Sequence, residues 1–275
     1  MTKLAVFGAG GKMGRRLARN LVHSDFYTVY VEISDYGRKK LFEEVGVECV
    51  DVNSALIDVN VVILAVPDQM IEVIANEIID LLPYGAMIMC LDAAAPFAGH
   101  LPSRKDVSYF VSHPCHPPIF NDETSADAKR DHFGGVAAKQ AIVNSLIQGS
   151  ETDYLLGDKV AKTIYAPVMR SHRLSLESMA LLEPGLSETV CASLLSVMKD
   201  AMDEVISRGV PPEAARDFLL GHMNILGAVI FDQVDGMFSE ACNKAIQFGK
   251  PMLMRDDWKR VFELEEISAS IKRIT

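Results

Sequence analysis

The sequence predicts an α/β protein with a doubly wound, mostly parallel sheet at the N-terminus and an all-helical C-terminal domain. Three observations support this fold class. An apolar strand runs directly into a glycine-rich turn and a helix at the start of the chain. Short apolar runs then alternate with helical patterns, as a parallel sheet built from strand–helix–strand units requires. Beyond about residue 150, only helical periodicity remains.

The opening segment KLAVFGAGGKMGRRL, from Lys3 to Leu17, predicts the dinucleotide-binding turn of a Rossmann domain. Glycines permit a tight turn and let backbone N–H groups approach a pyrophosphate, while the helix N-terminus faces the phosphate charge. The spacing is one residue longer than the usual GxGxxG, so the flanking strand and helix support the prediction against an ordinary strand-to-helix turn. The residues expected to bind the coenzyme here are Gly8, Gly10, Gly11, Lys12, Met13 and Gly14.

Glu32 is expected to bind the coenzyme ribose. It closes the apolar run that begins at Tyr27, at the distance from the glycines where a ribose partner is found. A carboxylate there accepts hydrogen bonds from both ribose hydroxyls and repels a 2′-phosphate, which favours NAD over NADP. The basic residues Arg38, Lys39 and Lys40 keep NADP open as the alternative, and a solvated strand end is the structural alternative for Glu32.

Four further strands are expected, at residues 61–66, 86–91, 107–111 and 141–147, with a crossover helix over 68–82. Ligands of doubly wound sheets collect beyond the carboxyl ends of the strands. The loops at that edge, at 66–68 and 92–96, are therefore expected to line the coenzyme. The residues of these loops expected to contact the coenzyme are Val66, Pro67 and Asp68.

The second half predicts helices. Ser150 and Asp153 have the spacing of a capping box that opens a helix to about residue 165, and later helices are expected near 185–208, 211–232, 236–248 and 256–273. We place the boundary near Pro167. Residues 1–166 then form the dinucleotide-binding domain, and residues 167–275 form a substrate and dimerisation domain, whose methionines indicate helix packing and a homodimer interface.

Composition excludes several classes of protein. The 275 residues carry 27 basic and 37 acidic side chains, a net charge of −10, and no basic stretch suited to nucleic acid. No apolar run approaches the ~20 residues that cross a bilayer, so no membrane partner is expected. A strand that starts at Lys3 leaves no room for a signal peptide, and five cysteines without CxxC pairs indicate reduced thiols. A cytoplasmic location is expected.

The loop His113-Pro-Cys-His-Pro-Pro118 follows the strand expected at 107–111 and is the first candidate for chemistry. Prolines stiffen the backbone around both imidazoles, which would hold His113 and His116 over the coenzyme edge. Histidine titrates near neutrality and can exchange a proton with a hydroxyl while hydride moves. The alternatives are a structural loop, or zinc ligation with Cys115, for which the sequence shows no second cluster.

Glu188 and His222 are the second candidates. His222 lies among Phe218, Ile225 and other apolar residues on one predicted helix face, so a buried imidazole would need a partner. Glu188 begins the preceding helix, and a Glu–His contact across two packed helices would polarise the ring. Glu183, in the turn before it, either adds a second carboxylate or is solvated. Guanidinium groups at Arg170, Arg173 and Arg255 are candidates for holding a substrate carboxylate.

Five segments resemble the phosphogluconate-dehydrogenase-like oxidoreductases, with affinity to the ketol-acid reductoisomerases. They are GAGGKMG, LAVP, HPCHPP, EPGLSET and RGVPPEAARDFLLGHMN, in that order along nearly the whole chain. The resemblance implies an NAD-linked dehydrogenase for a small polyhydroxy acid, with scope for coupling oxidation to migration of a carbon group. It also implies a helical, dimer-forming second domain.

Two departures limit what the resemblance implies. Ketol-acid reductoisomerases place acidic metal ligands where this chain has Phe218 and His222, and only Glu188 has an evident counterpart, so no metal site is expected. Larger hydroxyacid dehydrogenases place lysine and asparagine where Glu188 stands. His222 and Asn224 are then expected to take over proton transfer and positioning.

The leading hypothesis is hydride transfer from a hydroxy acid to NAD, with His113, His116, Glu188 and His222 handling protons and Asn224 positioning the substrate. A magnesium-dependent reductoisomerase is the second hypothesis. A non-catalytic NAD(H) sensor that binds a protein partner is the third.

Overall fold

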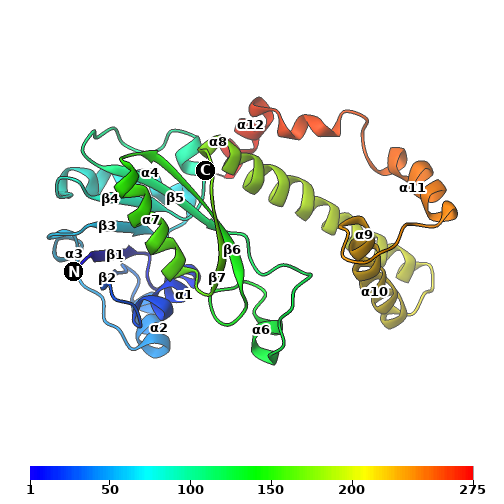
Figure 1. Cartoon of the computed structure of the whole chain (residues 1–275), viewed down its shortest axis with the longest axis horizontal. Coiled ribbons are helices and arrows are strands. Elements are labelled where there is room, and N and C mark those ends of the chain that lie inside the picture. The colour runs from blue at the N-terminus through cyan, green and yellow to red at the C-terminus, as the bar shows by residue number, and fades with distance from the viewer. Residues whose placement is uncertain (275) are drawn as a thin grey trace. The chain divides into compact units, whose positions relative to one another are not determined.

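The structure is a computed structural model and describes residues 1–274 (Figure 1). It contains two compact units. The first comprises Met1–Glu183 and the chain from Ser268 onward, and the second comprises Pro184–Ile267. All strands among the described residues belong to the first unit.

The first unit is built on a sheet that has seven strands within residues 1–274, in the order β2-β1-β3-β4-β5-β6-β7. Neighbouring strands pair in parallel except β5 and β6, which are antiparallel. The expected doubly wound, mostly parallel sheet is therefore confirmed. The strands are β1 (Lys3–Phe7), β2 (Tyr27–Val31), β3 (Val61–Leu64), β4 (Met87–Cys90), β5 (Ser108–Pro114), β6 (Gln140–Gln148) and β7 (Val168–Arg173).

Helices cover both faces of the sheet (Figure 1). Successive side chains of a strand point to opposite faces, so Leu4 and Val6 join one core while Ala5 and Phe7 join the other. Both faces are apolar, as parallel sheets require. The first core is completed by α1 (Lys12–Leu21), α2 (Asp35–Val45) and α7 (Glu151–Ile164), and the second by α3 (Val52–Leu56), α4 (Asp68–Ile78), α5 (Ala94–Phe97) and α8 (Leu176–Ala180).

The Ser150 capping box predicted from the sequence is confirmed at the start of α7. The Ser150 side chain accepts from the Asp153 N–H, and the Asp153 carboxylate accepts from the Ser150 N–H at 2.7 Å. These bonds satisfy donors that a helix N-terminus leaves unpaired. Two short elements, η1 (Ile79–Leu81) and α6 (Ala126–Arg130), complete the first unit before β7.

The reversed direction of β6 decides which residues share the carboxyl edge of the sheet. His113 near the end of β5 pairs with Val143, and Ala141 near the start of β6 pairs with Arg170 of β7. The end of β5 and the start of β7 therefore lie at the same edge. The strand expected at 107–111 continues to Pro114, so His113 belongs to the strand itself and its ring is positioned by the ladder.

The boundary differs from the one expected at Pro167. Residues 168–173 form β7, which pairs with β6, and α8 packs Met179 into the core of the sheet. The division between compact units therefore lies at Glu183–Pro184. The reason is that β7 is a polar edge strand, VMRSHR, whose pairing comes from the ladder with β6 and leaves no apolar pattern in the sequence.

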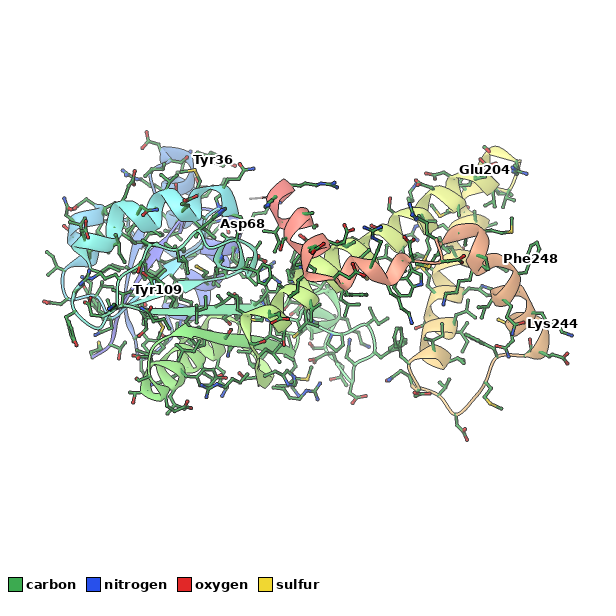
Figure 2. The ribbon with its side chains drawn as sticks, turned by 90° about the horizontal axis from the view of Figure 1, so that it is seen from above. Tyr36, Asp68, Tyr109, Glu204, Lys244 and Phe248 are labelled. Carbon is green, nitrogen blue, oxygen red and sulfur yellow. The ribbon has the colours of Figure 1, made fainter. Side chains whose placement is uncertain are left out.

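The described residues of the second unit are helical, as expected. A π-helical segment, η2 (Leu181–Ala192), leads into α9 (Ser193–Ser207), and α10 (Pro212–Ile230), α11 (Glu240–Leu253), η3 (Trp258–Phe262) and α12 (Leu264–Ile274) follow. Pro212 occupies the first turn of α10, where a missing N–H costs little. Figure 2 shows Glu204 on α9 and Lys244 and Phe248 on α11.

Large apolar side chains of the second unit are exposed on the single chain. Phe218 is 69% exposed, and Phe248 and Leu253 are each 75% exposed. The apolar face of α10 that should bury His222 is thus open to solvent in one chain. Large exposed apolar side chains in such number are typical of a surface that binds a partner.

Gly14→Ala should destabilise the first unit. A Cβ at Gly14 would lie 2.2 Å from the Gly8 carbonyl oxygen, which is backbone and cannot move aside. We expect a loss of about 1–3 kcal/mol, seen as a lower thermal midpoint. Gly11→Ala is the matched control, because its Cβ meets the same oxygen at 3.2 Å. Equal midpoints for the two variants would contradict the close packing of α1 on its turn.

Candidate active site

The glycine turn after β1 has the geometry of a phosphate cradle. Gly8 has a φ of +75°, and a Cβ there would lie 2.4 Å from the Ala65 carbonyl oxygen. The N–H groups of Gly8 and Ala9 donate to the Val31 carbonyl at 3.0 and 3.1 Å. Among the described residues, no side chain caps the N-terminus of α1. The first backbone N–H groups of the helix can therefore donate to a phosphate.

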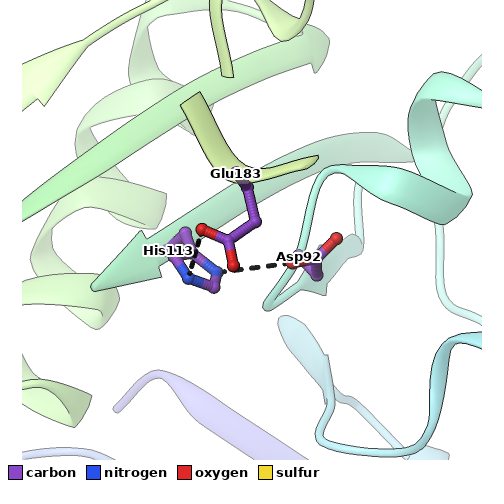
Figure 3. A group of neighbouring side chains, drawn as sticks. All are labelled: Asp92, His113 and Glu183. Carbon is purple, nitrogen blue, oxygen red and sulfur yellow. Dashed lines mark ion pairs between the residues drawn. The ribbon is translucent and has the colours of Figure 1, made fainter. Parts of the chain in front are cut away.

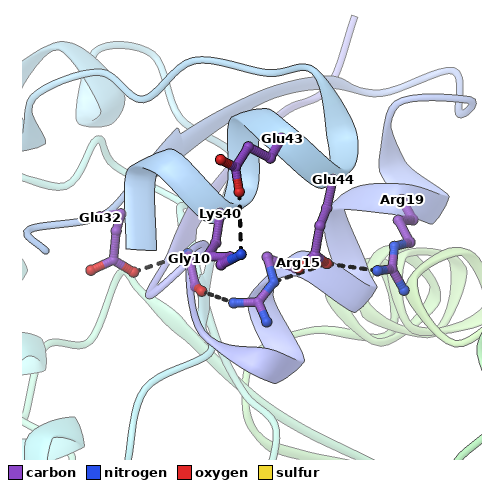
Figure 4. Close-up of polar contacts among 7 residues, drawn as sticks. All are labelled: Gly10, Arg15, Arg19, Glu32, Lys40, Glu43 and Glu44. Atoms are coloured by element: carbon purple, nitrogen blue, oxygen red, sulfur yellow. Dashed lines mark hydrogen bonds and ion pairs between the residues drawn. The ribbon is translucent and has the colours of Figure 1, made fainter. Parts of the chain in front are cut away.

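Glu32 holds this turn against the next strand and helix (Figure 4). One carboxylate oxygen accepts from the Gly10 N–H at 2.9 Å, and the other accepts from the Ser34 N–H at 2.9 Å. Gly10 and Gly37 are in backbone contact, since a Cβ on Gly10 would lie 2.5 Å from Gly37. Glu32 is therefore fixed at the turn by two backbone donors, at the place where the ribose was predicted.

A cavity of about 450 Å³ adjoins Glu32. Gly8, Gly11 and Glu32 line it together with apolar side chains of the loop after β3 and of α4, such as Val66 and Ile74. A mostly apolar wall with two carboxylates, Glu32 at the glycine turn and Glu77 on α4, suits an adenosine group, whose base is flat and whose ribose donates two hydrogen bonds. These residues fit the coenzyme half that the sequence predicted.

The basic residues that kept NADP open are engaged elsewhere. Arg38 Nε donates to the Glu32 carbonyl oxygen at 2.6 Å, and Lys40 pairs with Glu43 at 3.2 Å (Figure 4). Arg15 and Arg19 both bind Glu44 and so join α1 to α2. The charged residues that line the cavity are thus both acidic, Glu32 and Glu77.

A second cavity, of about 380 Å³, lies at the carboxyl edge of the sheet. It shares Gly11, Ala65, Val66 and Pro67 with the first cavity, so one extended ligand can reach both. Its other lining residues include three more of the predicted coenzyme contacts, Lys12, Met13 and Asp68, and two further titratable side chains, Asp92 and His113.

His113 is the centre of a buried charged cluster (Figure 3). Its Nδ1 lies 2.9 Å from the Leu91 carbonyl oxygen and 3.6 Å from Asp92, and its Nε2 lies 3.1 Å from Glu183. Burial alone lowers the pKa of this imidazole, but the hydrogen bond and charge of Glu183, followed by the charge of Asp92, raise the pKa to about 9. His113 is therefore an imidazolium at neutral pH.

The pKa values of the carboxyl groups around His113 are shifted in different directions. Burial raises the pKa of Asp68 to about 6, with help from the negative charge of Asp92. Burial also raises the pKa of Asp92. Burial opposes ionisation of Glu183, but His113 more than offsets this and lowers its pKa. Such separation of acid and base strengths in one cavity is typical of proton-transfer sites.

Sequence reasoning weighed Glu183 but left it undecided, and it assigned Asp92 only to a lining loop. The position of Asp92 directly after β4 was the available signal. The sequence held no such signal for Glu183, because its contact with His113 joins segments far apart in the chain.

His116 lies beside this cluster. Its ring is edge-on to that of His113, with centroids 6.1 Å apart, and its Nδ1 lies 2.9 Å from the Phe133 carbonyl oxygen. The structure thus brings the two loop histidines together, as expected. The zinc alternative with Cys115 gains no support. Within residues 1–274, the side chains close enough together to hold a metal ion are those of Asp92, His113 and Glu183, whose donor atoms lie within 4.8 Å of one another, and Cys115 is not among them.

That trio offers two carboxylates and an imidazole to a divalent cation. The contact of Nδ1 with the Leu91 carbonyl oxygen orients the His113 ring. Metal-bound histidines are commonly oriented in this way, by a hydrogen bond from the ring nitrogen that does not bind the metal. In this structure the two His113 ring nitrogens form ion pairs with the carboxylates of Asp92 and Glu183.

Three predicted residues, Glu188, His222 and Asn224, lie in the second unit. The His222 ring stacks on Phe218 at 3.9 Å, and its Nδ1 lies 2.8 Å from the Phe218 carbonyl oxygen. His222 is exposed rather than buried on the single chain, so the expectation that it sits within an apolar core is wrong for one chain. The roles of these three residues stay predictions.

None of the helices within residues 1–274 combines the length and the apolar character that crossing a membrane requires. The five cysteines, all among the described residues, are free thiols, as the odd number predicted.

Comparison with known proteins agrees with the motifs. Residues 121–275, more than half of the chain, match the family described as phosphogluconate dehydrogenase (decarboxylating), C-terminal, and residues 3–91 match the family described as NADP oxidoreductase, coenzyme F420-dependent. Two proteins named D-apionate oxidoisomerase are similar over full length. The one from Rhizobium rhizogenes is 65% identical over 100% of both chains, and the one from Cupriavidus necator is 64% identical over 99% of both.

A solved structure agrees as well. It is described as a semialdehyde dehydrogenase NAD-binding protein from Cupriavidus necator in complex with calcium and NAD; it is 64% identical, covers 100% of both chains and superimposes with a TM-score of 0.99. The resemblance inferred from the sequence motifs is therefore confirmed: the chain belongs to the phosphogluconate-dehydrogenase-like family of NAD-dependent oxidoreductases, together with the D-apionate oxidoisomerases.

Proposed function

We propose that this chain oxidises D-apionate, a small polyhydroxy acid, with NAD and couples the oxidation to isomerisation. One observation carries the proposal. The cavity at the carboxyl edge joins the coenzyme turn, through Gly11, to the titratable groups of Asp68, Asp92 and His113. A coenzyme laid along the two cavities would bring its reactive ring to those groups. The full-length likeness to two D-apionate oxidoisomerases supplies the substrate.

The chemistry requires two proton-handling groups. Oxidation moves a hydride from the substrate C–H to NAD and releases the hydroxyl proton to a base. Isomerisation then moves a carbon group from the neighbouring hydroxyl-bearing carbon to the new carbonyl carbon, so that one C–C bond breaks as another forms. The hydroxyl becomes the new carbonyl, and its proton passes to the former carbonyl oxygen. We assign the first proton to His116. We assign the second to the His113–Glu183 pair, in which an imidazolium and a carboxylate of opposite charge lie 3.1 Å apart and can share one proton.

The second unit is assigned to substrate binding and to a homodimer. Phe218, Phe248 and Leu253 are exposed on one chain, and a second copy would cover them. In that assembly His222 would gain the apolar surroundings that the sequence predicts. Glu188 and His222 remain proton-handling candidates there, and Asn224 a positioning candidate. The dimer is assigned to the cytoplasm, on the strength of the unpaired cysteines.

A cation-dependent reductoisomerase is the second candidate function. Two observations favour it: Asp92, His113 and Glu183 present donor atoms within 4.8 Å of one another, and the similar protein from Cupriavidus necator was solved with calcium and NAD. The hard oxygen donors suit Mg²⁺ or Ca²⁺.

The purified chain should reduce NAD when D-apionate is added. Absorbance of NADH measures the oxidation, and NMR of the product distinguishes a rearranged carbon skeleton from a simple ketone. Unchanged turnover after removal of divalent cations with EDTA excludes the second candidate. Loss of turnover that Mg²⁺ or Ca²⁺ restores favours it. Absence of NADH with D-apionate in either condition contradicts the proposed substrate.

Glu32→Gln should weaken binding of NAD and improve use of NADP. The amide loses the charge-assisted hydrogen bonds to the ribose and no longer repels a 2′-phosphate, which predicts about a 10-fold rise in KM for NAD. Steady-state kinetics with both coenzymes measure the change. Glu48→Gln, an exposed carboxylate after α2, is the control. An unchanged ratio of kcat/KM for the two coenzymes would show that Glu32 does not face the ribose.

Glu183→Gln should lower the pKa of His113 from about 9 to its ordinary value of 6.5 or below, because burial then acts without its main opponent. In the wild type, the raised pKa stabilises the fold fully below pH 6.5, and this contribution is lost as pH rises through about 9. The lowered pKa of Glu183 contributes above pH 4.5 and is lost on acidification.

The wild type should therefore exceed the variant in stability most clearly between pH 4.5 and 6.5, and the difference should shrink as pH rises toward 9. Histidine NMR titration and urea unfolding at several pH values measure both effects. Glu177→Gln, an exposed carboxylate in α8, is the control. A His113 titration midpoint that stays near 9 in Glu183→Gln would rule out this pairing.

The homodimer predicts a sedimentation mass of about twice the 30.2 kDa chain. Phe218→Glu should shift the distribution to monomer, since a charge on that face opposes burial. Tyr84→Glu, on an exposed site of the first unit, should leave the mass unchanged. A wild-type monomer at micromolar concentration would contradict the assignment.

A further inference from the structure

The backbone of His116 adopts a conformation that needs external support. Its φ is +61°, in the left-handed region that residues with a Cβ rarely occupy. Such conformations persist where surrounding contacts over-determine them, and they concentrate at functional sites. Here the support comes from residues 131–138, which we call the 131–138 turn.

The contact between this turn and His116 fixes the tautomer of the ring. The Phe133 carbonyl oxygen lies 2.9 Å from Nδ1, and a carbonyl oxygen only accepts, so Nδ1 carries the hydrogen. In the neutral ring, Nε2 then keeps its lone pair and can accept a proton. The opposite tautomer would place two acceptors against each other.

The turn itself is held by one carboxylate. The Asp131 side chain accepts from the backbone N–H groups of Val136, Ala137 and Ala138 at 3.0, 2.9 and 3.2 Å. Burial opposes ionisation of Asp131, but these donors outweigh it and lower its pKa. Gly134 closes the turn against Gln140, where a Cβ would lie 2.5 Å from the Gln140 side chain.

Two side chains of α1 anchor the turn to the coenzyme-binding helix. The Asn20 amide donates to the Gly135 carbonyl at 3.2 Å and to the carbonyls of Ile164 and Ala166. The Arg16 guanidinium lies 4.6 Å from the centroid of the Phe133 ring. Phe133 is 62% exposed, yet its ring contacts both the Arg16 guanidinium and the His116 ring, whose centroid is 5.9 Å away.

We propose that the 131–138 turn is a positioning device for His116, in which Asp131 and Phe133 act as positioning residues that keep Nε2 available as the proton acceptor. This inference rests on the proposed function, in which His116 takes the hydroxyl proton. It assigns a catalytic purpose to a turn whose sequence shows no catalytic motif.

The test compares Asp131→Asn with Asp127→Asn, an exposed aspartate on α6. Long-range ¹H–¹⁵N spectra of the histidine rings report the tautomer directly, and the spectrum of His116→Gln identifies the His116 signals. In the wild type and in Asp127→Asn we expect the Nδ1–H form alone. In Asp131→Asn we expect both tautomers and a kcat about 10-fold lower with D-apionate, while KM for NAD stays unchanged.

Each outcome has one meaning. A folded Asp131→Asn protein whose His116 stays wholly in the Nδ1–H form overturns the inference, whatever its kcat. A mixture of tautomers with an unchanged kcat supports the positioning role but contradicts the assignment of His116 as the base.

Phe133→Leu covers the case in which Asp131→Asn does not fold, because it changes an exposed ring and retains the carbonyl. It should keep the Nδ1–H tautomer and lower kcat a few-fold through loss of the ring contact. A wild-type kcat in Phe133→Leu would overturn the role of that ring.

Discussion

Close backbone packing at the glycine turn is the constraint on which the rest of the site depends. Gly14 sits against Gly8, and Gly10 sits against Gly37, at separations that leave no room for a Cβ. These contacts bring α1 and α2 together at the end of β1 and let Glu32 reach the Gly10 N–H. The coenzyme track therefore has a fixed starting point, and both cavities are defined from it because both include Gly11.

The charge at the other end of the track has a different origin. Parallel strands deliver Asp68, Asp92 and His113 to one edge, where burial makes every ionised group costly. Glu183 resolves part of that cost by pairing with His113. Asp68, whose pKa is raised to about 6, can hold or release a proton near neutrality, and burial raises the pKa of Asp92 as well. A site for an anionic sugar acid benefits from this, because protonated carboxyls and an imidazolium reduce the repulsion that three carboxylates would exert.

The two histidines of the loop are supported in different ways. The ladder between β5 and β6 positions His113, whereas His116 depends on a turn that reaches it from α1. Helix α1 thus supports both the coenzyme turn at its N-terminus and the 131–138 turn along its side. One helix thus links the glycine turn to the turn that contacts His116, and a shared rigid element keeps the relative geometry of the two within narrow limits.

Local patterns in the sequence were sufficient for part of this account. Glycine spacing, strand ends and helical periodicity are short-range signals, so they predicted the strand–turn–helix at the start of the chain, the capping box at Ser150 and the helices of the second unit. The predicted coenzyme contacts Glu32, Val66 and Pro67 line one cavity. The tertiary structure alone decided that β7 joins the sheet, that Glu183 meets His113 and that Phe133 holds His116. Each of those depends on contacts between segments distant in the chain, whose approach is set by strand direction and core packing rather than by any local pattern.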